Sequence, residues 1–217
     1  MDKRYQVIAL MGKAGAGKDT IQSATCHKHP ELFNKIISCT TRPPRDNEKN
    51  GKDYHFLSVI DFTHKVLNGD MLEATEFRDW FYGTSIDSLV EDKINIGVFN
   101  PAGVEALLQT PNISVLVIYV DVDDKTRLMR YLQRSEHPDC AEMCRRYFAD
   151  EKDFADLDFE YVTISNDNGE NMDLLSKKDL VNTIYTMWYH TGQPLYLMDS
   201  ARKTIKAKSA KNEVKND

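Results

Sequence analysis

The sequence lacks an excess of positive charge, since it holds 28 Lys and Arg residues against 34 Asp and Glu residues, a net charge of −6. A chain with this balance has no overall field that attracts nucleic acid, so we expect no nucleic-acid partner and look for local anion sites. Long hydrophobic runs are also missing, and no stretch is long enough to span a bilayer, which predicts no membrane partner. The first apolar run, residues 5–11, returns at once to glycine and charge. This pattern favours a buried strand over a secretion signal, so a cytoplasmic location is expected.

Cysteine is scarce, and its spacing is not that of a metal site. Cys26 and Cys39 are isolated, and Cys140 and Cys144 lie one helical turn apart with His137 upstream. A zinc site built from these residue types needs a fourth ligand and a tighter pair such as Cys-x-x-Cys. We therefore expect buried or half-buried thiols, with the last two on a helix.

Apolar segments of strand type alternate with segments of helical type. Strands are expected at residues 5–11, 35–39, 53–58, 71–77, 80–85, 94–100, 113–121 and 160–165. Helices are expected at residues 18–27, 58–68, 101–109, 123–134, 140–154 and 177–190. Asn100 followed by Pro101 is a typical helix start, because Asn caps and Pro fits the first turn. The alternation predicts an α/β fold with a mostly parallel sheet.

A glycine-rich loop, "GKAGAGKDT", joins the first expected strand to the first helix with the spacing G-x-x-x-x-G-K. Glycines let successive backbone N–H groups point at phosphate oxygens, and the helix start adds partial positive charge. The lysine of this motif reaches the β- and γ-phosphates, and the next residue is usually a magnesium ligand. Here Asp19 occupies that position and Thr20 follows it, so both are expected Mg²⁺ ligands. The expected ATP-binding residues of the loop are Gly12, Lys13, Ala14, Gly15, Ala16, Gly17, Lys18, Asp19 and Thr20.

A second anion site is indicated by "SCTTRPPRDNEKNGKDYHF", residues 38–56. Arg42 and Arg45 flank a Pro-Pro pair that holds the backbone extended. Two guanidinium groups at this spacing can clamp one phosphate, and Tyr54 adds a hydroxyl donor. The alternative is a polar surface loop with solvated arginines.

This segment resembles the GMP-binding signature of the guanylate kinases, S-x-T-T-R-x-P-R…N-G-x-D-Y-x-F, and the resemblance continues through "MLEATEFRDWFYGTS". It covers about residues 6–167. It implies the three-layer fold of the P-loop NTPases, with a parallel sheet, an inserted α+β subdomain for the nucleoside monophosphate and a helical lid. The implied single domain comprises a core (1–37, 85–133 and 153–190), a GMP-binding insert (38–84) and a lid (134–152). Residues 201–217 are rich in Lys and Arg and poor in apolar residues, so a flexible basic tail is expected there.

The resemblance also implies roles for single residues. Glu73 would accept from guanine N1–H and the 2-amino group, two adjacent donors that adenine does not present. Lys18 and the lid residues Arg134 and Arg146 would be catalytic, and Asn166 would lie near the adenine of ATP. The GMP-binding residues would be Ser38, Arg42, Arg45, Tyr54, Glu73, Tyr82, Thr84 and Asn100. The substrates would be ATP, with Mg²⁺, and GMP or dGMP.

The sequence departs from the family pattern at several places. The usual Asp-x-Asp before the next helix is Val98-Phe99-Asn100, and the loop has Lys13 for Pro and Ala14 for Ser. Because these carboxylates are missing, an alternative function is that of a deoxynucleoside monophosphate kinase with altered or broader acceptor specificity.

Two further classes of protein are alternatives to the kinase. A non-catalytic guanylate-kinase-like binding module typically lacks the phosphate loop, which is intact here. A P-loop GTPase would need an Asn-Lys-x-Asp element, and no such tetrapeptide occurs in the sequence. Arg127 and Arg130 are expected on a solvated, acid-paired helix face. A monomer and a homodimer are both compatible with the sequence.

Overall fold

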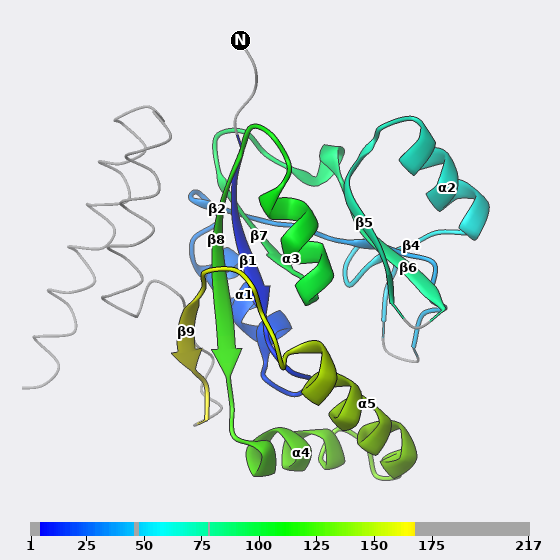
Figure 1. Cartoon of the computed structure of the whole chain (residues 1–217), viewed down its shortest axis with the longest axis vertical. Coiled ribbons are helices and arrows are strands. Elements are labelled where there is room, and N and C mark those ends of the chain that lie inside the picture. Colours follow the sequence, from blue (N-terminus) through cyan, green and yellow to red (C-terminus); the bar gives the residue numbers. More distant parts are fainter. Residues whose placement is uncertain (1–4, 46–47, 78, 168–217) are drawn as a thin grey trace, which may run out of the picture.

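The computed structural model describes residues 5–45, 48–77 and 79–167 (Figure 1). The helix expected at 177–190 and the basic tail at 201–217 lie outside these residues. In the part of the chain that is described, no helix has the length and apolar character needed to cross a membrane.

A five-stranded sheet forms the centre of the molecule, with the order β2-β7-β1-β8-β9 and every pair parallel. Parallel strands need crossover connections, which the helices provide. The strands are β1 (Tyr5–Met11), β2 (Phe33–Lys35), β7 (Ile94–Val98), β8 (Ile113–Asp121) and β9 (Val162–Ser165). The helices packed on this sheet are α1 (Lys18–Lys28) and α3 (Pro101–Leu108).

The central strand β1 is buried on both faces, as its unbroken apolar run requires. Ile8 and Leu10 belong to a core cluster that includes Ile21 of α1. Val7 and Ala9, which point to the other face, belong to a second cluster that includes residues of α3. The two helices therefore cover opposite faces, and the molecule has three layers here (Figure 1).

A second, mixed sheet with the order β4-β3-β6-β5 lies beside the first. Its helix α2 is capped by Ser58, whose hydroxyl accepts from the backbone N–H of Asp61. Phe62 of α2 stacks on Phe81 of this sheet at 5.7 Å between ring centroids. The elements are β3 (Cys39–Thr40), β4 (His55–Phe56), α2 (Val59–Leu67), β5 (Met71–Phe77), β6 (Trp80–Ser85) and the 3₁₀ turn η1 (Ile86–Ser88).

The single strand expected at residues 35–39 is wrong, because the chain crosses from one sheet to the other within it. The N–H of Ile36 still donates to the carbonyl of Ile96 in the central sheet (2.8 Å). Cys39, three residues later, pairs with His55 and Gly83 of the second sheet. One apolar run therefore serves two sheets, which a sequence pattern does not distinguish from one strand.

Helices α4 (Asp124–Leu132) and α5 (Cys140–Asp153) lie at the carboxyl end of β1 and β8 (Figure 1). The carboxylates of Asp123 and Asp139 cap them by accepting from backbone N–H groups of the first turn. In open α/β sheets ligands bind at the carboxyl ends of the strands. These helices therefore border the expected nucleotide site.

Candidate active site

The phosphate loop connects β1 to α1 and has a backbone that requires glycine. Gly12, Gly15 and Gly17 have φ angles of 147°, 86° and 88°, in the region that side chains disfavour. A Cβ at Gly12 would lie 2.5 Å from the carbonyl oxygen of Val120, and one at Gly17 would lie 2.7 Å from Nδ2 of Asn166. The loop thus packs closely against β8 and against Asn166, which follows β9.

Lys18, the first residue of α1, curls back over the loop, and its Nζ donates to the carbonyl of Gly12 (2.6 Å). Burial lowers the pKa of this lysine, the nearby carboxylates of Asp19 and Asp150 oppose that shift, and Arg134 adds to it. A desolvated ammonium held over the loop is well placed to meet the phosphates of a nucleotide.

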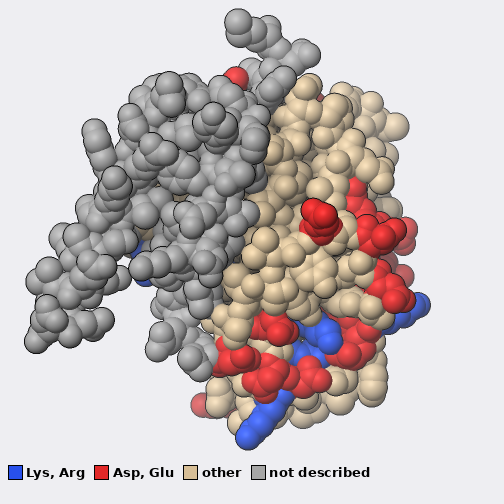
Figure 2. Space-filling model, turned by 60° about the vertical axis from the view of Figure 1, so that its left-hand side comes forward, with Lys and Arg blue, Asp and Glu red and all other residues tan. Residues whose placement is uncertain are grey.

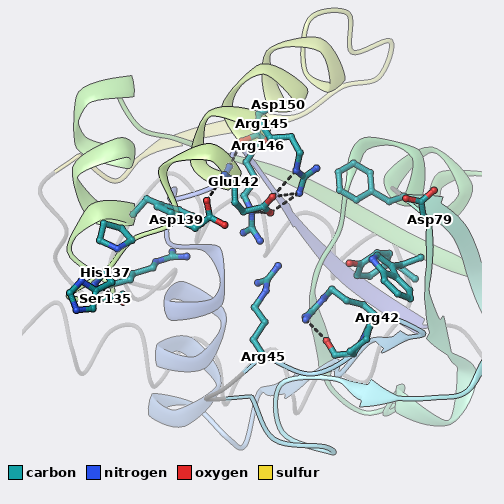
Figure 3. Close-up of a pocket in the computed structure, with 18 residues that line it drawn as sticks. Arg42, Arg45, Asp79, Ser135, His137, Asp139, Glu142, Arg145, Arg146 and Asp150 are labelled. Carbon is teal, nitrogen blue, oxygen red and sulfur yellow. Dashed lines mark hydrogen bonds and ion pairs between the residues drawn. The ribbon is translucent and has the colours of Figure 1, made fainter.

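A cavity of about 800 Å³ opens between the second sheet and helices α4 and α5 (Figure 3). Arginine side chains line it from two sides. The lining arginines are Arg42 and Arg45 from the segment after β3, and Arg134, Arg145 and Arg146 from the α4–α5 region. This concentration of guanidinium groups suits a polyanion.

The side chains expected to clamp the acceptor phosphate lie together. Arg42 lies over the Tyr54 ring at 5.4 Å from its centroid, and the Tyr54 and Tyr82 rings are 6.2 Å apart. Glu48, which the sequence did not single out, lies between the two arginines. Its Oε1 is 2.9 Å from Nη2 of Arg42 and 3.7 Å from Nη1 of Arg45. The signal in the sequence was an acid three residues after Arg45.

The electrostatics of the cavity link its two sides. Burial lowers the pKa of Arg45, and the charges of Arg146 and Arg42 lower it further. Burial also raises the pKa of the Tyr54 hydroxyl to about 12, and the negative charge of Asp19 on α1 contributes to this increase. Like charges from separate elements therefore approach one another here, and a phosphate between them would relieve the repulsion.

A carboxylate of α5 holds the neighbouring lid arginines. Glu142 accepts from Nε and Nη2 of Arg145 (2.6 Å each) and from Nε of Arg146 (2.7 Å). Burial raises the pKa of Glu142, but the guanidinium hydrogen bonds outweigh this, so the pKa lies below its usual value. Arg134, just past α4, is exposed and lines the same cavity.

Glu73 on β5 and Thr84 on β6 are cross-strand neighbours in the second sheet. Burial raises the pKa of Glu73 to about 7, although Thr84 opposes the shift through its side chain and backbone. The Thr84 hydroxyl is fully buried and, among the described residues, has no hydrogen-bond partner of good geometry. Burial of a carboxyl and a hydroxyl is costly unless hydrogen-bond partners compensate both groups.

The start of α3 lies next to this pair. Asn100 caps α3 as expected, with its Oδ1 accepting from the N–H of Gly103 (2.7 Å). A Cβ built on Gly103 would lie 3.6 Å from an oxygen of Glu73. Ser38 lies half-buried just before β3, with its carbonyl accepting from the N–H of His55. The structure therefore brings Glu73, Thr84 and Asn100 together.

The family model described as guanylate kinase matches residues 4–178. The chain belongs to the guanylate kinase family. It is 29% identical over 175 residues to a guanylate kinase of Chlamydia felis, covering 78% of this chain and 85% of that one. It is 42% identical over 86 residues to a guanylate kinase of Thermosynechococcus vestitus, covering 40% of this chain and 44% of that one.

The fold agrees with the family. A crystal structure of guanylate kinase from Anaplasma phagocytophilum superimposes with a TM-score of 0.51 at 20% identity, covering 76% of this chain and 79% of the other. The expected α/β class with a parallel central sheet and a further mixed sheet is confirmed. The boundaries assigned to core, insert and lid stay a prediction, although the second sheet spans residues 39–85.

Asn166, which the guanylate kinase resemblance places near adenine, lies buried directly after β9. Its Nδ2 donates to the carbonyl of Ala16 in the phosphate loop (2.8 Å). Arg130 donates to the carbonyls of Gly15 (3.2 Å) and Asn166 (2.6 Å), so the expectation of a solvated Arg130 is wrong. Both side chains support the loop from behind, and contact between Asn166 and adenine stays a prediction.

Arg127 is also not solvated, since only 2% of its side chain is exposed. Its guanidinium contacts Asp124 (2.7 Å), Asp150 (3.5 Å) and Glu151 (2.8 Å) and lies 4.4 Å from the centroid of the Tyr147 ring. The expected pairing with acids is confirmed, but the pairing buries the arginine. The reason is that α5 folds over this face of α4, which the spacing of α4 alone does not reveal.

The cysteines offer no metal site. Cys140 and Cys144 lie on α5 as expected but are exposed, so the expectation of buried thiols there is wrong. Cys39 is buried and Cys26 half-buried, and burial raises the pKa of both thiols. No group of three or more His, Cys, Asp or Glu side chains suited to a metal ion occurs within residues 5–45, 48–77 and 79–167.

Proposed function

We propose that this member of the guanylate kinase family transfers the terminal phosphoryl group of ATP to the phosphate of GMP or dGMP. The observation that supports this most directly is the arginine-lined cavity, which lies between the phosphate loop and the second sheet. Phosphoryl transfer needs little covalent chemistry from the protein, because positioning and charge stabilisation supply most of the catalysis. A cavity with cations on both sides meets that need.

Each side of the cavity would hold one substrate. The loop N–H groups and Lys18 would bind the phosphates of ATP, since Lys18 already lies over the loop. Arg134 and Arg146 would stabilise the charge that spreads over the moving group. The acceptor phosphate would be held by Arg42, Arg45, Tyr54 and Tyr82.

Base recognition would fall to Glu73, with Thr84, Ser38 and Asn100 around it. An ionised Glu73 offers two acceptors to the N1–H and 2-amino donors of guanine. The buried Thr84 hydroxyl lacks a well-aligned partner among the described residues, as a side chain that awaits a ligand would. Adenine would leave the carboxylate unpaired in a buried site, and this mismatch would exclude it.

The donor set at the start of α1 fits Mg²⁺. Asp19 and Thr20 are exposed next to the phosphate loop and present hard oxygen atoms. Magnesium keeps few protein ligands and completes its shell with water and substrate phosphates. The ion would neutralise charge on the β- and γ-phosphates when it is bound.

The test is an ADP-release assay with ATP, Mg²⁺ and GMP, dGMP, AMP or dTMP in turn. We expect turnover with GMP and dGMP and at least a hundredfold lower kcat/KM for AMP, about 2.7 kcal/mol. If the enzyme prefers a monophosphate with another base, that nucleotide is the acceptor and not GMP. If no monophosphate is phosphorylated, the proposed kinase activity is wrong. A cytoplasmic location and a monomeric or homodimeric state remain part of the proposal.

A further inference from the structure

Two consecutive acids near the end of α5 contact two consecutive residues of the phosphate loop. Oδ2 of Asp150 accepts from the backbone N–H of Ala14 (2.7 Å), and Oε1 of Glu151 accepts from Nζ of Lys13 (2.6 Å). These contacts join residues more than 130 positions apart in the sequence. The loop is therefore tied to α5 as well as to the sheet.

Arg127 of α4 completes this arrangement, because its guanidinium contacts both acids (3.5 Å to Asp150, 2.8 Å to Glu151). Asp150 and Arg127 are both buried. A buried carboxylate so close to a phosphate site would repel a nucleotide unless a cation compensated its charge. Arg127 provides that compensation from behind the loop.

Asp150 stands four residues after Arg146 on α5, so the two side chains share one face of the helix. Both line the arginine-rich cavity, and Figure 3 shows them on the same helix. The contact that holds Asp150 on the loop thus also sets how far Arg146 stands from the loop. A helix anchored one turn from a functional side chain leaves that side chain little freedom.

We propose that Asp150 is a positioning residue that fixes the phosphate loop against α5, with Arg127 and Glu151 in support. It prepares the loop for the nucleotide and holds Arg146 at a constant distance from the transferred group. The carboxyl-terminal half of α5 is then an anchored element, and movement of the lid is confined to its first turn and the α4–α5 connection. The catalytic part of this inference rests on the proposed function.

The test compares Asp150→Ala and Asp150→Asn with wild type. Asn keeps an oxygen for the Ala14 N–H but removes the charge that faces Arg127. The matched control is Asp156→Ala, which removes an exposed acid just after α5. Steady-state kinetics give kcat and the KM of each substrate, and calorimetry gives the Kd of Mg·ADP without any turnover.

For Asp150→Ala we expect the KM of ATP and the Kd of Mg·ADP to rise about tenfold, equivalent to about 1.4 kcal/mol. We expect kcat to fall by a similar factor because Arg146 loses its anchor, while the KM of GMP stays within about twofold. Asp150→Asn should recover a large part of the Mg·ADP affinity. The control should behave as wild type.

Unchanged Mg·ADP affinity in both variants would overturn the proposal, and so would tighter binding, which would mean that the carboxylate competes with phosphate. A parallel rise in both KM values would assign Asp150 a merely structural role and would also overturn it. If Asp150→Ala does not fold, the same kinetic and binding measurements on Asp150→Asn are compared with wild type. If wild type shows no GMP kinase activity, the proposed function fails separately, because Mg·ADP binding still tests the loop contact.

Discussion

In Lys18 and in Glu73, burial shifts the pKa toward neutral pH. Burial lowers the pKa of Lys18 and raises that of Glu73 to about 7. Each is expected to act in its charged form, one on ATP phosphates and one on guanine. The protein therefore holds both charges in places that disfavour them, and the substrates would supply the missing partners.

Lys18→Ala should reduce kcat at least a hundredfold, because losing one preorganised charge on the transferring phosphates costs about 3 kcal/mol or more. The variant should fold, since the Lys18 ammonium contacts backbone carbonyls of the loop and no acid of the core. Kinetics together with a thermal melt check both statements. Near-normal turnover of a folded variant would remove Lys18 from the site.

The pH dependence of GMP binding should reveal Glu73. Its carboxylate pairs with guanine only when ionised, so the KM of GMP should rise as the pH falls from 8 to 6, through the pKa of about 7. Glu73→Gln should raise the KM of GMP, flatten this profile and narrow the GMP-to-AMP preference about tenfold, or 1.4 kcal/mol. The measurement is kcat/KM for both nucleotides across this pH range.

If Glu73→Gln has the same pH profile for the KM of GMP as wild type, and the same preference for GMP over AMP, another group recognises the base. The KM of ATP, measured in parallel, is the control. The KM of ATP should not follow this titration, because Glu73 lies in the second sheet, opposite Thr84, and not in the phosphate loop.

At the scale of elements, Glu48 connects the two arginines that follow β3. Glu48 accepts from the N–H of Arg45 (2.9 Å) while its other oxygen faces both arginines. The carboxylate thus orients the guanidinium groups before an acceptor arrives. Pro43 and Pro44 limit the backbone between them.

Glu48→Ala should therefore raise the KM of GMP about fivefold to tenfold, about 1 kcal/mol or slightly more, with little change in the KM of ATP. Loss of the carboxylate frees two arginine side chains that must be ordered again on binding. Glu76→Ala removes an exposed acid of β5 and is the matched control. A tighter GMP complex in Glu48→Ala would show instead that Glu48 competes with the phosphate.

At the scale of the whole molecule, the chain passes from the central sheet to the second sheet at residues 36–38, and the arginine-lined cavity lies between the second sheet and helices α4 and α5. In this fold, the protonation of Glu73 affects how stability depends on pH. Its pKa is raised in the folded protein, so the folded state keeps the proton between about pH 4.5 and 7 while the unfolded state loses it. The contribution of Glu73 to the free energy of unfolding is therefore lost as the pH rises from about 4.5 to 7.

Glu73→Gln removes this titration and should become more stable than wild type as the pH rises, with a gain of up to about 3 kcal/mol between pH 4.5 and 8. Urea unfolding at several pH values measures the difference in free energy of unfolding. A difference that is constant with pH would contradict the raised pKa. Asp156→Ala, which alters an exposed acid, should show no such trend.

The sequence by itself determined the features that depend on neighbouring residues. The bounds of β1 and β8 match expectation because largely apolar runs define a strand locally. The cap at Asn100 also matches, since a cap is a contact over three residues. The phosphate-loop motif and the arginine pair after β3 are recognisable for the same reason, since each is one continuous stretch of chain, and their binding roles stay predictions.

Only the tertiary structure decided which distant residues meet. The run at 35–39 divides between two sheets because its partners, Ile96 and Gly83, lie far along the chain. Arg127 is buried because acids of α5 fold onto it, and Asp150 reaches Ala14 across 136 positions. Spacing within a segment carries no information on such contacts, because burial and pairing depend on how elements pack and not on their own pattern.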